Sequence, residues 1–92
     1  MSNLVLEEKT SKASMDDHRS ALDSALKEQF PGGMLKSQWQ GDVLELSGPG
    51  AKGTIVLQGD QLVGKATLSP PASLMARMIE EKITTVLKKA VS

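Results

Sequence analysis

Two Gly-Asp pairs, Gly41-Asp42 and Gly59-Asp60, constrain the fold of this chain more than any other feature. Each pair separates two runs in which apolar and polar residues alternate, and such runs are typical of β-strands. A two-residue loop that begins with glycine favours a type II′ hairpin turn, because glycine accepts the positive φ of the first loop position. We therefore expect two tight hairpins. Their strands span residues 34–40, 43–47, 54–58 and 61–68.

The two turns also determine which side chains share a face of the sheet, since cross-strand partners point to the same side. The first turn pairs Trp39 with Leu44, and the second pairs Leu57 with Leu62. A slip of one residue would turn the apolar side chains to the wrong face, so this register is well determined. The expected inner face carries Leu35, Trp39, Leu44, Leu46, Ile55, Leu57, Leu62, Gly64, Ala66 and Leu68.

The remaining segments complete the predicted fold. Residues 4–6 predict a short first strand, and apolar residues at helical spacing predict a helix over 15–30. An amphipathic helix is expected after Pro71 and continues to the end of the sequence. The segment 48–50 between the hairpins, Gly-Pro-Gly, predicts a looser connection.

These elements predict an α+β fold with two layers and the order β-α-β-β-β-β-α. An antiparallel sheet with one apolar face needs a cover, and the two amphipathic helices supply it on that one face. A length of 92 residues suits a single domain over residues 1–92, with 1–3 and 92 expected to fray.

Composition excludes several classes of function. Eleven basic and eleven acidic residues give zero net charge, whereas nucleic-acid binding usually needs a basic patch. The absence of cysteine excludes disulfides and thiolate metal sites. No apolar run approaches the roughly 20 residues of a membrane span, and no targeting segment is visible, so we expect a cytoplasmic protein.

The residues that could carry chemistry do not form a catalytic constellation. His18 is the only histidine, and it lies on the apolar stripe of the first helix, where we expect it to be a structural residue. The segment 48–53 is rich in glycine but lacks the Gly-Lys-Ser/Thr ending of a phosphate loop. We therefore expect no enzymatic activity, no metal and no cofactor.

Two exceptions to ordinary packing remain as candidate sites. Small residues on the inner face either let a helix approach closely or leave room for an apolar ligand. The candidate ligand residues are Leu57, Leu62, Gly64, Ala66, Met75 and Met78. An outer-face patch of valines suits either ordinary strand packing or a homodimer interface. Its members are Val43, Val56 and Val63.

Three short motifs resemble one known family. They are Trp39-Gln40-Gly41-Asp42-Val43-Leu44, Gly53-Thr54-Ile55, and Met78-Ile79-Glu80-Glu81-Lys82-Ile83 with Leu87. This pattern resembles the small bacterial polyhydroxyalkanoic acid system proteins, also called polyhydroxyalkanoate granule region proteins, from the first helix to the end of the chain. The resemblance implies a cytoplasmic bacterial protein linked to stored polyester, and it offers no catalytic residues.

The resemblance favours a non-enzymatic accessory protein that associates with polyhydroxyalkanoate granules or with their proteins. The alternative is a carrier of a small apolar ligand, of lipid or hydroxyacyl type, held between the sheet and the C-terminal helix. The expected partners are a second copy of the chain, a granule-associated protein or the polyester surface, with no nucleic acid and no transmembrane segment.

Overall fold

The computed structural model describes residues 2–12, 14–31, 35–70 and 72–91, and it shows helices and strands in the predicted order. The elements are β1 (Ser2–Lys9), the 3₁₀ turn η1 (Met15–His18), α1 (Arg19–Gln29), β2 (Lys36–Gln40), β3 (Val43–Gly48), β4 (Ala51–Gln58), β5 (Gln61–Leu68), the 3₁₀ turn η3 (Ala72–Met75) and α2 (Ala76–Val91).

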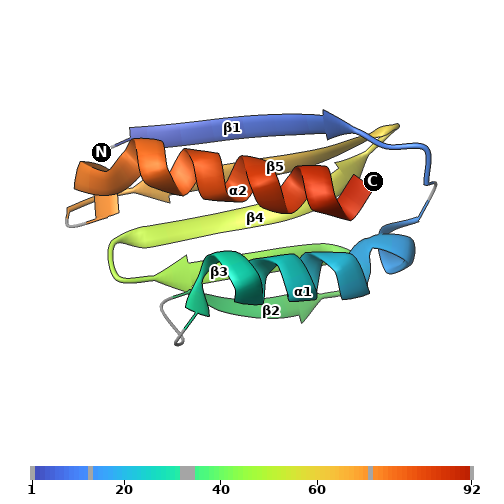
Figure 1. The fold of residues 1–92 in the computed structure, drawn as a ribbon, viewed down its shortest axis with the longest axis horizontal. Coiled ribbons are helices and arrows are strands. Elements are labelled where there is room, and N and C mark those ends of the chain that lie inside the picture. The colour runs from blue at the N-terminus through green and yellow to red at the C-terminus, as the bar shows by residue number, and fades with distance from the viewer. Residues whose placement is uncertain (1, 13, 32–34, 71, 92) are drawn as a thin grey trace.

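The strands form one antiparallel sheet in the order β1-β5-β4-β3-β2, shown in Figure 1. Both Gly-Asp turns pair the strands as predicted: Trp39 lies opposite Leu44, and Leu57 lies opposite Leu62. The two turn glycines have φ values of 59° and 60°, and no non-glycine residue in the described part of the chain has positive φ. These values fit type II′ turns and confirm the predicted register.

The prediction of a loose connection at Gly48-Pro49-Gly50 is wrong. Gly48 pairs directly with Ala51, so β3 and β4 are joined by a tight turn at Pro49-Gly50. Proline suits the first central position of a type II turn, and the second requires positive φ, which Gly50 supplies at 74°. As a result, β4 begins three residues earlier than the predicted Thr54.

The first strand is longer than the three residues that sequence alone predicted. β1 covers Ser2–Lys9 and pairs along its whole length with β5, from Ser2 opposite Leu68 to Lys9 opposite Gln61. It therefore forms one edge of the sheet, and β2 forms the other. The backbone of Thr10 continues the pairing by donating a hydrogen bond to the carbonyl of Asp60 at 2.8 Å.

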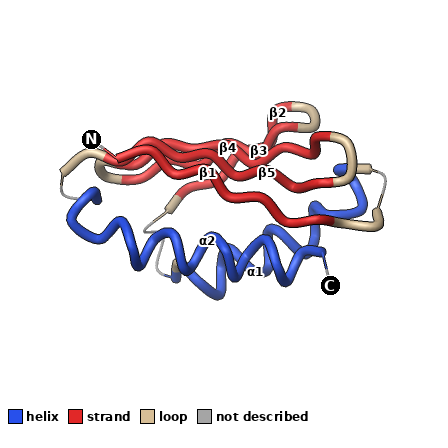
Figure 2. The backbone as a smooth tube through the Cα atoms, turned by 90° about the horizontal axis from the view of Figure 1, so that it is seen from above, coloured by secondary structure: helices blue, strands red, loops and turns tan. Residues whose placement is uncertain are grey.

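Both helices lie on the same face of the sheet, as predicted, and Figure 2 shows the two layers edge-on. α2 packs over β1 and β5, and α1 lies beside α2. The core between the layers is aliphatic, and its largest fully buried apolar side chains are Leu22, Leu44, Ile55, Leu62, Leu68, Val86 and Leu87.

The helix lies close to the sheet at Gly64. A Cβ added to this glycine would lie 3.5 Å from Cδ1 of Leu87 and 3.6 Å from Cγ2 of Ile83, which are ordinary van der Waals separations. Side chains of α2 therefore fill the space above Gly64. Packing becomes looser at the next inner row, beside Ala66.

Candidate functional site

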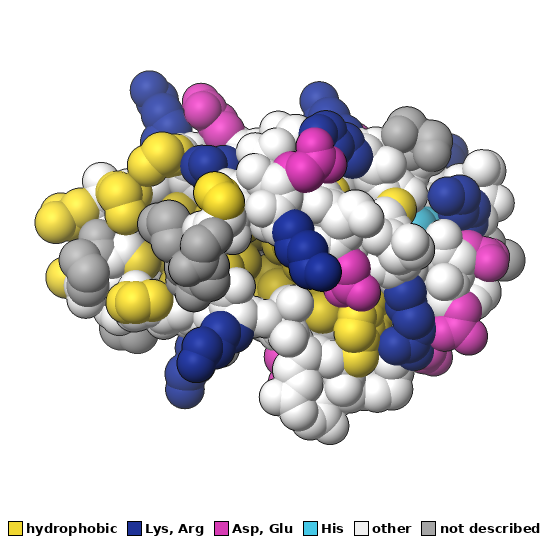
Figure 3. All heavy atoms as spheres, turned by 60° about the horizontal axis from the view of Figure 1, so that its bottom comes forward, with side chains coloured by type: hydrophobic (Ala, Val, Ile, Leu, Met, Phe, Trp, Pro, Cys, Tyr) yellow, Lys and Arg dark blue, Asp and Glu magenta, His cyan; other side chains and the backbone are white. Residues whose placement is uncertain are grey.

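An apolar pocket opens between the two layers at one end of the molecule. Its volume is about 280 Å³, and its walls come from the end of α1, the first half of α2 and the inner face of the sheet. Figure 3 shows a hollow with a hydrophobic floor and further hydrophobic side chains gathered near it. Residues that define its walls include Phe30, Leu35, Leu46, Ala66, Met75 and Ile79.

Small residues in the sheet make room for this pocket. Ala66 of β5 pairs with Gly53 of β4, and Ala51 of β4 pairs with Gly48 of β3 on the same face. Four neighbouring positions therefore project at most a methyl group toward the helices. Because an apolar hollow with few polar groups is the usual form of a small-molecule site, this hollow is the candidate ligand-binding site of the molecule.

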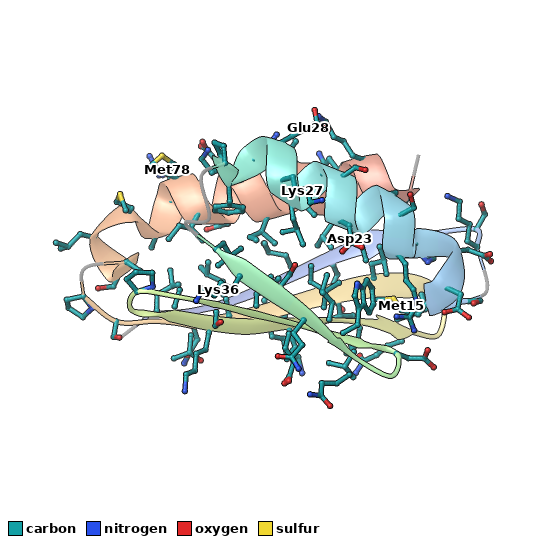
Figure 4. The ribbon with its side chains drawn as sticks, turned by 90° about the horizontal axis from the view of Figure 1, so that it is seen from below. Met15, Asp23, Lys27, Glu28, Lys36 and Met78 are labelled. Carbon is teal, nitrogen blue, oxygen red and sulfur yellow. The ribbon has the colours of Figure 1, made fainter. Side chains whose placement is uncertain are left out.

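Exposed apolar side chains surround the start of α2 beside this pocket. Leu74 is 83% exposed, Met75 43% and Met78 45%. Figure 4 shows Met78 on the side of α2 that is turned away from the sheet. We call Leu74, Met75 and Met78 the apolar rim. Met75 and Met78 also line the pocket, so the exposed surface and the cavity are continuous.

One charged side chain contributes to the pocket wall from the helix layer. The ammonium group of Lys82 donates a hydrogen bond to the main-chain carbonyl of Gln29 at 2.7 Å, and it lies 5.6 Å from the centre of the Phe30 ring. This bond satisfies a carbonyl at the C-terminal end of α1, where a cation also complements the helix dipole. No Asp, Glu or His lines the pocket among the residues that the structure describes.

The structure brings together half of the six predicted ligand residues. Ala66, Met75 and Met78 line the pocket. Gly64 does not, because Leu87 and Ile83 cover it. The other two also lie outside the pocket lining: Leu62 is completely buried in the core, and Leu57 is half-buried against it.

Sequence reasoning missed the part of the site that Gly53, Ala51 and Phe30 provide. Gly53 and Ala51 alternate along β4 on the inner face, so extending the predicted register back from Ile55 could have found them. Phe30 comes from the end of α1, and no local pattern places it against the sheet.

The three valines proposed as an interface lie on the outer face. Val56 pairs with Val63, and Val43 adjoins Val56 one position beyond the pair Leu44–Ile55. Val63 is only 3% exposed, and the other two are half-buried. The row therefore offers little apolar surface, and homodimerisation through it stays a prediction.

His18 is fully buried at the opposite end of the helix layer. Its Nε2 lies 2.9 Å from the hydroxyl oxygen of Thr10, and its Nδ1 lies 2.8 Å from the carbonyl oxygen of Ser14. The carbonyl can only accept, so Nδ1 carries a proton, and in the neutral ring Nε2 accepts from the Thr10 hydroxyl. Both ring nitrogens are engaged in joining segments of the fold.

The described part of the chain holds no cluster of three His, Cys, Asp or Glu side chains suited to a metal ion. None of its described helices has the length and apolar character needed to cross a membrane.

Comparison with known proteins identifies one family. The family model for polyhydroxyalkanoic acid system proteins matches residues 9–91, which is nearly the whole chain. No curated protein matches the chain.

Proposed function

The chain belongs to the family of polyhydroxyalkanoic acid system proteins, and from that premise we propose that it is a non-enzymatic accessory protein that attaches to polyhydroxyalkanoate granules. The attachment surface is the apolar rim of Leu74, Met75 and Met78, together with the pocket that it borders. The polyester itself is the partner, because its alkyl side chains present an apolar surface.

The exposure of the apolar rim is the observation that carries this proposal. Leu74 keeps 83% of its surface in water, and neighbouring Met75 and Met78 keep nearly half of theirs. Fully burying one such side chain stabilises a complex by about 1.5–3 kcal/mol, so the exposed rim favours contact with an apolar partner. Methionine adapts well to an irregular surface because its unbranched side chain is flexible and polarisable.

The chemistry of the pocket supports binding rather than catalysis. The polar groups in its described lining are Gln29, Lys82 and the β4 residue Lys52. Strand alternation places the Lys52 side chain on the outer face, away from the pocket. General acid–base or nucleophilic catalysis needs convergent groups within hydrogen-bond reach of a substrate, and these residues do not supply such a set.

Sedimentation with amorphous polyhydroxyalkanoate particles tests the proposal. We expect the purified protein to pellet with the particles, and we expect Leu74→Gln combined with Met78→Gln to weaken its apparent affinity by at least about tenfold. Val5→Gln is the matched control, because Val5 is 61% exposed on the other face of the sheet. Failure of the parent protein to pellet, or equal pelleting of the rim variant, would refute attachment through the rim.

A further inference from the structure

The pocket differs from the apolar rim because it is a cavity whose apolar walls include one charged side chain, Lys82. We infer that it binds one medium-length acyl chain that ends in a carboxylate, with the chain in the apolar cavity and the carboxylate beside Lys82. This inference deepens the proposed function, since it assigns a discrete ligand to the pocket that the granule-binding rim borders. It requires binding in free solution, where no polyester surface is present.

The volume of the pocket sets the length of the chain. A cavity of about 150 Å³ holds benzene, so the present cavity of about 280 Å³ has room for roughly eight to twelve non-hydrogen atoms. An acyl chain of about eight carbons with its carboxylate falls within this range.

The walls are suited to an alkyl chain. The floor is formed by Gly53 and Ala66, which pair across β4 and β5, and Leu46 lies beside Gly53 on β3. The roof is formed by Met75, the last residue of η3, and by Ile79 in the first turn of α2. A rigid sheet floor and a flexible methionine side chain together allow the roof to close on chains of different shape.

Lys82 supplies the charge complementarity. Its ammonium group has three N–H donors, and one is bonded to the carbonyl of Gln29. No carboxylate of the described residues lies within ion-pair distance of Lys82. A carboxylate at the end of a bound chain would accept one of the remaining donors, and a charge-assisted bond of this kind is stronger than a neutral one.

Methyl NMR of the methionines provides a direct measurement. Octanoate is titrated into protein labelled at the methionine methyl groups. We expect saturable shifts of Met75 and Met78, which line the pocket. Met15 is the internal control, because it is buried in the core outside the pocket lining and should not move.

Two variants test separately the cavity that holds the acyl chain and the lysine that faces its carboxylate. Ala66→Leu places a larger side chain in the pocket and should abolish octanoate binding. Its matched control is Thr67→Leu, at the next position of β5 on the outer face. Lys82→Gln should weaken octanoate binding by about tenfold and leave binding of neutral 1-octanol unchanged.

Each outcome decides the inference. Saturable octanoate binding that is lost in Ala66→Leu and weakened in Lys82→Gln supports it. No saturable shift in the parent protein overturns it, and so does unchanged binding in a folded Ala66→Leu variant. If Ala66→Leu does not fold, a competition experiment takes its place, in which 1-octanol displaces octanoate and the Met75 and Met78 methyl shifts report the exchange. Failure of 1-octanol to compete overturns the assignment of octanoate to the pocket. Unchanged octanoate affinity in Lys82→Gln overturns the role of Lys82.

The sedimentation and NMR experiments test different claims, so either can give a negative result without the other. Granule attachment without octanoate binding would leave the proposed function standing and remove this inference. Octanoate binding without granule attachment would establish the ligand site and remove the proposed function.

Discussion

The guanidinium carbon of Arg19 lies 4.4 Å from the centre of the Trp39 ring, in a cation–π contact that joins α1 to the first hairpin. The same guanidinium group donates hydrogen bonds to the carboxylate of Asp16 at 2.6 Å and to the carbonyl of Gly41 at 2.7 Å. The indole N–H of Trp39 donates to Asp23, also on α1, at 3.1 Å. One arginine and one tryptophan thus join α1 to the first hairpin through polar and cation–π contacts.

Arg19→Ala should therefore weaken the attachment of α1 to the hairpin. We expect a loss of about 1–2 kcal/mol in the free energy of unfolding, the sum of a cation–π contact and a hydrogen bond to the hairpin turn. Urea unfolding followed by fluorescence measures it directly, because Trp39 is the chain's only tryptophan. Lys27→Ala, at an exposed position on the same helix, should change stability by less than about 0.5 kcal/mol. Equal effects of the two substitutions would contradict the role of Arg19.

The turn glycines divide into two kinds, and substitution by alanine should distinguish them. Gly41 and Gly50 both have positive φ, so alanine is strained at either position. At Gly41 a Cβ would meet open space, whereas at Gly50 it would collide with the main-chain oxygen of Ser69. We expect Gly41→Ala to cost about 1–2 kcal/mol and Gly50→Ala at least about 2 kcal/mol more. Thermal unfolding of both variants measures the difference, and similar melting temperatures would refute it.

The parts of this fold that sequence predicts are those that depend on local chemistry. The type II′ turns depend on local chemistry at Gly41 and Gly59, so the strand register follows from the sequence. The turn at Pro49-Gly50 also has a local signal, since proline and glycine suit the two central positions of a type II turn, and the predicted loose connection overlooks it. What local sequence does not show is the contact that holds this turn: the backbone N–H of Ser69 donates to the Gly50 carbonyl at 2.7 Å. Only three of the six predicted ligand residues line the pocket, because part of its lining depends on packing between distant segments. Ala66 lies on a predictable face, whereas Phe30 reaches the pocket only through the packing of α1 against α2.

Two glycines inside the sheet lead to opposite predictions. A Cβ on Gly53 would lie 2.6 Å from the main-chain oxygen of Lys65, so Gly53→Ala requires the strands to shift. A Cβ on Gly64 would make ordinary contacts with Leu87 and Ile83. Gly53→Ala should destabilise the protein by about 1–3 kcal/mol through overpacking. Gly64→Ala should be neutral or should stabilise it by about 0.5 kcal/mol, because glycine is unfavourable within a strand.

Chemical denaturation of the two alanine variants tests this difference. A greater loss of stability in Gly64→Ala than in Gly53→Ala would mean that α2 lies closer to β5 than the structure shows. The Gly53 variant also bears on the pocket, since a methyl group there would raise its floor.

The buried pair His18 and Thr10 should behave as a single energetic unit. Thr10 is 6% exposed, and its hydroxyl oxygen also accepts the backbone N–H of Lys12 at 3.2 Å, so the pair joins the end of β1 to the start of the helix layer. His18→Ala leaves a cavity and an unsatisfied hydroxyl, and we expect a loss of about 2–4 kcal/mol in the free energy of unfolding. Thr10→Val removes the hydroxyl at similar volume and should cost about 1–3 kcal/mol.

A double-mutant cycle then measures the coupling between the two side chains. Because each single change disrupts the same hydrogen bond, the double variant should be more stable than the sum of the two losses predicts, by about 0.5–3 kcal/mol. Ser24→Ala, an exposed position on α1, is a control that should add independently to His18→Ala. Simple additivity of the His18 and Thr10 changes would show that their contact contributes nothing to stability. Coupling would show that His18, the only histidine of this chain, contributes to the stability of the fold through its contact with Thr10.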